Sequence, residues 1–97
     1  MIIDEAFIHD VSTYCAQHAI LFKRTNPHHW CFRVEQIGET TLPTGKVVPK
    51  WRGQLDYWPS TNKLVMNQQW HDVKELKDIL ELQEWLALWR YELDHPT

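Results

Sequence analysis

The segment LDYWPSTNKL, residues 55–64, holds the turn that joins two strand-like runs of this chain. Apolar and polar side chains alternate before the turn, and apolar residues resume after it in KLVM. Pro59 has a backbone angle fixed near the value that the first corner of a turn needs, and Asn62 tolerates the left-handed conformation at its end. Turn chemistry accounts for every residue of the segment. We therefore predict a tight hairpin here rather than a catalytic or ligand-binding loop.

Three strands are predicted from the alternation of side chains around this turn. They span residues 28–36, about 46–58 and 63–69, and a polar loop over residues 37–45 joins the first two. Pro49 lacks a backbone N–H, so the first part of the second strand must lie at a sheet edge or a bulge. Two sets of side chains are each expected to share one face: Trp30, Phe32 and Val34 on the first strand, and Trp51, Gly53, Leu55 and Tyr57 on the second.

Helical periodicity predicts one helix before the strands and one after them. The first runs from Asp4 to about Phe22, and the second begins at Asp72, which forms a capping-box-like pair with Glu75. The order is then helix, three antiparallel strands, helix. This predicts an α+β fold of two layers, in which a three-stranded antiparallel sheet packs against two helices. The whole chain, residues 1–97, is expected to form a single domain.

The second helix carries two apolar stripes where a surface helix needs only one. The first stripe contains Val73, Leu76, Leu80 and Ala87. The second stripe contains Leu82, Trp85, Leu86, Trp89 and Leu93. Either the first helix covers the second stripe, or this stripe forms a homodimer contact or a contact with a target protein.

Composition points to a globular chain with an uneven charge distribution. Apolar residues make up 43% and charged residues 24%. Residues 20–52 carry six basic and two acidic side chains, whereas residues 1–19 and 53–97 are acidic. A basic, aromatic middle between two acidic ends suggests an interaction surface. The chain also has six tryptophans, more than a core of this size can fully bury, so some are expected to face a partner.

No segment has the features of a membrane span or a signal peptide. No apolar run approaches the roughly 20 residues that cross a bilayer. The amino terminus, MIIDEAF, is acidic where a signal peptide is basic. We therefore expect a cytoplasmic protein without membrane contact, in which Cys15 and Cys31 are free thiols.

Metal binding and catalysis find little support in the sequence. His28 or His29 lies near Cys31, but the paired ligand clusters typical of zinc sites are absent. No activated nucleophile or phosphate loop is evident, and Asp56 is expected to form at most an exposed ion pair with Arg52. We predict no metal site, no cofactor and no catalytic residue, and hence a protein that is not an enzyme.

Binding of a protein partner is the function that the sequence favours, because tryptophan and arginine dominate protein interfaces. The predicted partner-binding residues are Leu82, Trp85, Leu86, Trp89 and Leu93 on the last helix, and Lys46, Lys50, Trp51 and Arg52 in the basic middle. The alternative is a nucleic-acid-binding module, in which Trp30, Phe32, Trp51 and Tyr57 would stack on bases beside cations. The net charge of −3 argues against a polyanionic ligand.

The segment LDYWPSTNKL resembles the turn of small phage and prophage proteins. In those proteins an aromatic-Pro-Ser-Thr-Gly-Lys turn joins the second and third strands, and here Asn62 stands in the place of the glycine. The resemblance covers about residues 28–85 and is specific only in the turn. It implies a small stoichiometric protein that binds and inhibits a host protein complex in the host cytoplasm. An anti-CRISPR-like or other anti-defence inhibitor of a nucleic-acid-handling nuclease would fit this description.

The predicted element order is also similar to that of the double-stranded-RNA-binding domain. That family contacts duplex RNA partly through a lysine cluster that opens its last helix and through a hairpin loop. Here the corresponding HDVKELK has only two lysines beside acidic residues, and the loop IGETTLPTGK lacks the family's histidine. The resemblance therefore implies a topology and not duplex RNA binding.

Overall fold

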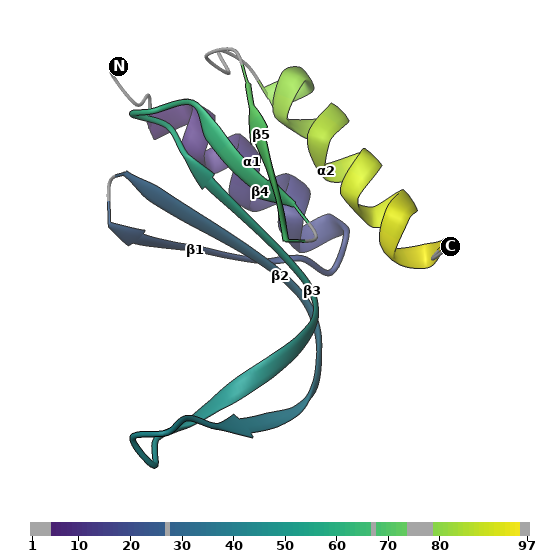
Figure 1. Cartoon of the computed structure of the whole chain (residues 1–97). Coiled ribbons are helices and arrows are strands. Elements are labelled where there is room, and N and C mark those ends of the chain that lie inside the picture. Colours follow the sequence, from purple (N-terminus) through teal and green to yellow (C-terminus); the bar gives the residue numbers. More distant parts are fainter. Residues whose placement is uncertain (1–4, 27, 67, 74–78, 96–97) are drawn as a thin grey trace.

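The computed structural model describes residues 5–26, 28–66, 68–73 and 79–95. These residues form one antiparallel sheet in the order β1-β2-β3-β4-β5, with two helices on one of its faces (Figure 1). The elements are α1 (Glu5–Gln17), β1 (Leu21–Asn26), β2 (His29–Thr41), β3 (Val47–Trp58), β4 (Lys63–Met66), β5 (Gln69–Asp72) and α2 (Ile79–Asp94). The α+β class and the two flanking helices are confirmed. The prediction of three strands was wrong, since the sheet has five.

The predicted first helix was too long, because its last residues form strand β1. Ala19 adopts a left-handed backbone angle (φ 55°), and the Ile20 N–H donates to the Cys15 carbonyl at 2.9 Å. This pattern closes a helix, with alanine in the position that glycine usually takes. Leu21 to Asn26 then pair with β2, and Phe22 stacks on Phe32 with 5.1 Å between the ring centroids. Spacings of three and four residues continue across this boundary, so periodicity alone did not reveal it.

The predicted third strand is a hairpin of two strands, β4 and β5. Met66 of β4 pairs with Gln69 of β5, and Gln68 between them has a left-handed conformation (φ 68°). Asp72 ends β5 and forms an ion pair with Lys63. The prediction that Asp72 caps the last helix was therefore wrong. Glu75 and Leu76 lie outside the described residues.

The hairpin at residues 55–64 is confirmed. Asn62 has φ 55°, the Thr61 N–H donates to the Trp58 carbonyl at 3.3 Å, and Lys63 pairs with Trp58 across the turn. The Val73 N–H also donates to the Asn62 carbonyl at 3.0 Å, which fastens the end of β5 to this turn. Local turn chemistry predicted this part of the fold correctly.

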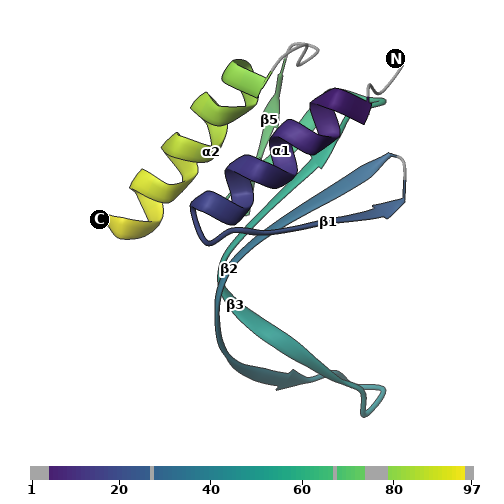
Figure 2. The same cartoon turned by 180° about the vertical axis from the view of Figure 1, so that it is seen from behind.

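Strands β2 and β3 extend beyond the rest of the sheet as a two-stranded arm. Gln36 to Thr41 pair with Val47 to Trp51, where neither β1 nor β4 lies alongside in the described residues. A register shift between Gln36 and Gly38, next to Glu35 at φ 50°, bends the arm away from the helices (Figures 1 and 2). The polar loop predicted over residues 37–45 is thus largely strand. Pro49 lies on an open edge of this arm, as predicted.

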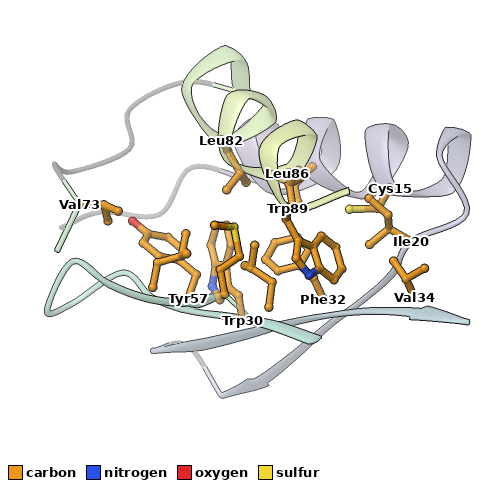
Figure 3. Packing of buried hydrophobic residues seen from close by; sticks show 14 residues of the cluster. Cys15, Ile20, Trp30, Phe32, Val34, Tyr57, Val73, Leu82, Leu86 and Trp89 are labelled. Carbon is orange, nitrogen blue, oxygen red and sulfur yellow. The ribbon is translucent and has the colours of Figure 1, made fainter. Parts of the chain in front are cut away.

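The core fills the space between the sheet and the two helices (Figure 3). The alternation predicted for β2 is confirmed, because Trp30, Phe32 and Val34 are all buried. The predicted face of β3 is confirmed for three of its four residues, since Leu55 and Tyr57 are fully buried and Gly53 lies beneath α2, while Trp51 is only half-buried. A Cβ added at Gly53 would approach the Leu93 side chain to 2.3 Å, so the missing side chain lets α2 lie close to the sheet.

The second stripe of the last helix belongs to this core and not to a surface. Leu82, Leu86 and Trp89 are fully buried, and all three point toward the sheet in Figure 3. Trp85 and Leu93 are half-buried and pack against the same cluster. Of the first stripe, Leu80 (66% exposed) and Ala87 are exposed, whereas Val73 is buried in the core. The prediction that the second stripe forms a homodimer or target contact is therefore corrected, because the sheet and α1 cover this stripe within one chain.

Replacement of Trp89 by alanine should strongly destabilise the fold. Removing a fully buried tryptophan lowers the free energy of unfolding by about 3–5 kcal/mol. The neighbouring Leu88→Ala is the matched control, because Leu88 is exposed and its loss should change stability by less than about 0.5 kcal/mol. Urea denaturation followed by circular dichroism measures both. Equal stabilities for the two variants would contradict the core position of Trp89.

Candidate functional site

The candidate site lies on the face of the sheet opposite the helices. Among the described residues, no helix covers this face (Figures 1 and 2). Strand alternation sends every second side chain to it. Those of β2 and β3 are His29, Cys31, Arg33, Gln54, Asp56 and Trp58. Lys23 of β1 shares this face, because it pairs with Cys31 on the neighbouring strand β2.

Three aromatic rings stack on one another across this face. The His29 ring lies on Trp58 with 4.5 Å between centroids and an angle of 9°, and Trp58 lies on Trp70 at 5.2 Å and 24°. Trp70 is 66% exposed, although a large indole is normally well covered in a folded chain. The excess of tryptophan expected from composition therefore lies here, on the sheet. Trp70 was not among the predicted binding residues, because strand β5 was not predicted.

A compact polar cluster lies next to the aromatic stack. The Asp56 Oδ1 atom is 3.1 Å from His29 Nε2 and accepts a hydrogen bond from Arg33 Nη2, also at 3.1 Å. The Cys31 Sγ atom lies 3.5 Å from the same His29 nitrogen and 3.2 Å from the Thr25 hydroxyl oxygen. Asp56 therefore pairs with Arg33 and not with Arg52 as predicted.

The environment of Cys31 keeps its thiol protonated. Burial raises the pKa of the Cys31 thiol, and the Asp56 carboxylate raises it further, while the hydrogen bond with Thr25 lowers it. The fully buried Cys15 on α1 has its pKa raised to about 12 by burial. Both cysteines are free thiols in the structure. Neither thiol has the lowered pKa that marks an activated nucleophile.

A shallow hollow of about 320 Å³ continues the site toward the base of the arm. The hollow lies beside β3 where β4 ends. Gln54 and Asp56, which also belong to the open face, line one side of it. Its remaining lining residues are Trp51, Arg52, Val65 and Gln68. The hollow and the aromatic stack thus lie on either side of Asp56.

The basic residues predicted for binding occupy two different environments. Lys46 and Lys50 are exposed on the arm. Arg52 lies at its base, where its Nε atom is 2.7 Å from Glu35 Oε2 and its Nη1 atom is 3.3 Å from Asp94 Oδ1. Trp51, half-buried, lines the hollow beside Arg52. Arg52 therefore ties the arm to the end of α2, while the two lysines remain available to a partner.

Comparison of the chain with protein-family models, curated proteins and solved structures finds no match in any of the three. Neither of the described helices combines the length and apolar character required to cross a membrane.

Alkylation of Cys31 should be slow and should accelerate when Asp56 is changed. Because burial and Asp56 raise the thiol pKa, little thiolate is present at pH 8, and iodoacetamide should react more slowly than with glutathione. Asp56→Asn should lower the pKa and speed the reaction several-fold. Asp72→Asn, an exposed carboxylate on β5, is the control and should have no effect. Mass spectrometry of the Cys31 peptide gives the rates, and identical rates in all three proteins would contradict this account.

Proposed function

We propose that this chain is a small, non-enzymatic binding protein that contacts a partner protein through the open face of its sheet and its arm. The exposure of Trp70, stacked on Trp58 in a row of rings, is the observation that carries this proposal. A rigid exposed indole is the kind of side chain that contributes most when an interface is desolvated. Holding it in a stack reduces the conformational entropy that binding would otherwise cost.

The arm supports the same proposal. Its exposed apolar side chains are Ile37, Leu42 and Val47, and its exposed lysines are Lys46 and Lys50. Two-stranded ribbons are marginally stable alone in water, so an arm of this kind gains from packing on another surface. A partner with an apolar patch bordered by carboxylates would complement it. We therefore retain the predicted role of Lys46 and Lys50 in docking an acidic patch, but the buried stripe of the last helix is no longer part of the proposed contact.

Pairing of charges on the open face and at the base of the arm favours a protein partner over a nucleic acid. Arg33 is paired with Asp56, Arg52 with Glu35 and Asp94, and Lys63 with Asp72. Binding to phosphates is driven by cations that release counterions, and cations already matched by carboxylates contribute little. A non-enzymatic role agrees with the protonated Cys31 thiol, which is the opposite of an activated nucleophile.

The resemblance of the turn to small phage proteins suggests the class of partner. We propose a host protein complex in the cytoplasm, such as a nucleic-acid-handling nuclease of a defence system, which the chain would inhibit by occupying its surface. The resemblance alone supports this step, whereas the exposed aromatic face supports binding of a protein in general.

Capture of a partner from a bacterial lysate should depend on Trp70. We expect Trp70→Ala on an affinity-tagged chain to reduce the recovery of a specific partner by about tenfold or more, as loss of an interface hot spot does. Tyr91→Ala is the matched control, because Tyr91 is a 62% exposed aromatic residue on α2, away from the open face. Quantitative mass spectrometry compares the amount of partner recovered by the wild-type chain and by each of the two variants. A partner retained by Trp70→Ala and lost with Tyr91→Ala would move the interface to the helices.

Nucleic-acid binding is the second candidate, favoured by the row of aromatic rings near Lys23, although Trp30, Phe32 and Tyr57, which were predicted to stack on bases, are buried. Under our first proposal, a labelled single-stranded oligonucleotide should bind only weakly, with no dependence on Trp70. Salt-sensitive micromolar binding that is lost in Lys46→Glu/Lys50→Glu and in Trp70→Ala, but kept in Leu80→Ala, would favour the nucleic acid instead. Fluorescence anisotropy at low and moderate salt measures it.

A further inference from the structure

Three different ligand atoms converge on one point of the open face. His29 Nε2 is 3.1 Å from Asp56 Oδ1 and 3.5 Å from Cys31 Sγ, and the three donor atoms all lie within 4.8 Å of one another. The sheet fixes this arrangement. His29 and Cys31 are two residues apart on β2 and share a face, and Asp56 is the residue directly opposite Cys31 on β3. The sequence did not reveal the set because strand pairing brings the carboxylate to the other two ligands.

Two of the three separations between the ligand atoms are close to the edges of a tetrahedral metal site, and the third, between the Cys31 sulfur and an Asp56 carboxylate oxygen, lies within 4.8 Å. With bond lengths of about 2.3 Å to sulfur and about 2.0 Å to nitrogen and oxygen, tetrahedral ligands lie about 3.6 Å apart for S–N and about 3.3 Å for N–O. The structure has 3.5 Å and 3.1 Å for these two edges.

A catalytic triad does not explain the cluster. In a triad the imidazole uses one ring nitrogen toward the nucleophile and the other toward the carboxylate. Here His29 Nε2 faces both Cys31 and Asp56. A single nitrogen carries either one proton or one lone pair, so it can satisfy only one of the two at a time. A cation at the common point would satisfy all three side chains together.

We propose that His29, Cys31 and Asp56 form a site for a zinc-class divalent metal ion, with its fourth position open to solvent. A thiolate and an imidazole together favour zinc-class ions over magnesium or calcium. The side chains of His29 and Asp56 are 25% and 17% exposed, so solvent reaches the cluster from the helix-free side. Three protein ligands and one open position form the type of site that keeps a water or accepts a donor atom from a partner.

Residues around the cluster orient its ligands. Stacking on Trp58 holds the plane of the His29 ring, and Thr25 contacts the Cys31 sulfur. Arg33 holds the Asp56 carboxylate through Nη2, while its Nη1 atom donates to the Phe32 carbonyl at 3.0 Å. Its positive charge also opposes a bound cation. The site should therefore bind more weakly than closed structural zinc sites with four protein ligands.

Cobalt binding tests the site on the isolated, reduced and metal-free chain. Co²⁺ should bind one ion per chain and give a near-ultraviolet thiolate-to-metal absorption band, which Zn²⁺ abolishes by displacement. The apparent affinity should rise with pH, because the Cys31 thiol must lose its proton. Cys31→Ser should lose the band, and His29→Ala and Asp56→Asn should weaken binding by more than about tenfold.

Matched controls separate the site from other histidines and thiols. His28→Ala removes the exposed neighbour of His29, and Cys15→Ser removes the buried thiol of α1; both should keep the band. Circular dichroism verifies that each variant is folded. Should Cys31→Ser not fold, His29→Ala and Asp56→Asn still test the site. An absent band in the wild type, or one that persists in His29→Ala and Asp56→Asn, would overturn the proposal.

The metal site does not rest on the proposed partner contact, because cobalt binding is measured on the chain alone. A chain that binds cobalt but captures no partner would retain the site and refute the proposed function. A chain that captures a partner but gives no cobalt absorption band would support the proposed function and refute the metal site.

Discussion

The indole of Trp30 contacts aromatic rings from three other elements, and the orientation of the whole sheet depends on this packing. Its ring centroid lies 5.8 Å from Phe7 of α1, 5.6 Å from Phe22 of β1 and 5.7 Å from Tyr57 of β3. Trp30 is completely buried. Because successive residues of a strand point to opposite faces, an inward Trp30 forces His29 and Cys31 outward. A shift of one residue would exchange the two faces and bury the polar cluster.

The outer face of the sheet therefore carries both the polar cluster and the row of aromatic rings. Asp56 is at their boundary: it accepts from Arg33, meets His29 and borders the hollow beside β3. His29 connects the polar cluster to the aromatic row through its stack on Trp58. A change of His29 from hydrogen bonding to metal binding would therefore also affect the stacked rings of Trp58 and Trp70, which we propose to contact a partner. This geometric link makes the two proposals compatible while leaving each with its own evidence.

The direction of the arm is set by a second group of contacts. The register shift near Gly38 bends the paired strands, and Arg52 at the base is held by Glu35 of β2 and Asp94 of α2. These ion pairs are exposed and individually contribute little to stability. Together they link the arm to the helical layer, so a partner that contacts both the arm and the open face would meet surfaces with a defined relative orientation.

The sequence by itself determined the features that depend on neighbouring residues. It gave the inward faces of β2 and β3, the Pro59–Asn62 hairpin, the open edge at Pro49 and the α+β class, because alternation and turn chemistry are local properties. Strand β1 and the division of β4 from β5 escaped it, since helix ends at Ala19 and turns at Gln68 use residues that are uncommon in left-handed conformations. Only the tertiary structure showed that α2 buries Trp89 and that Trp70 is the exposed indole. Pairing of distant strands brought Asp56 beside Cys31, because hydrogen bonding between strands creates neighbours that no spacing along the chain encodes.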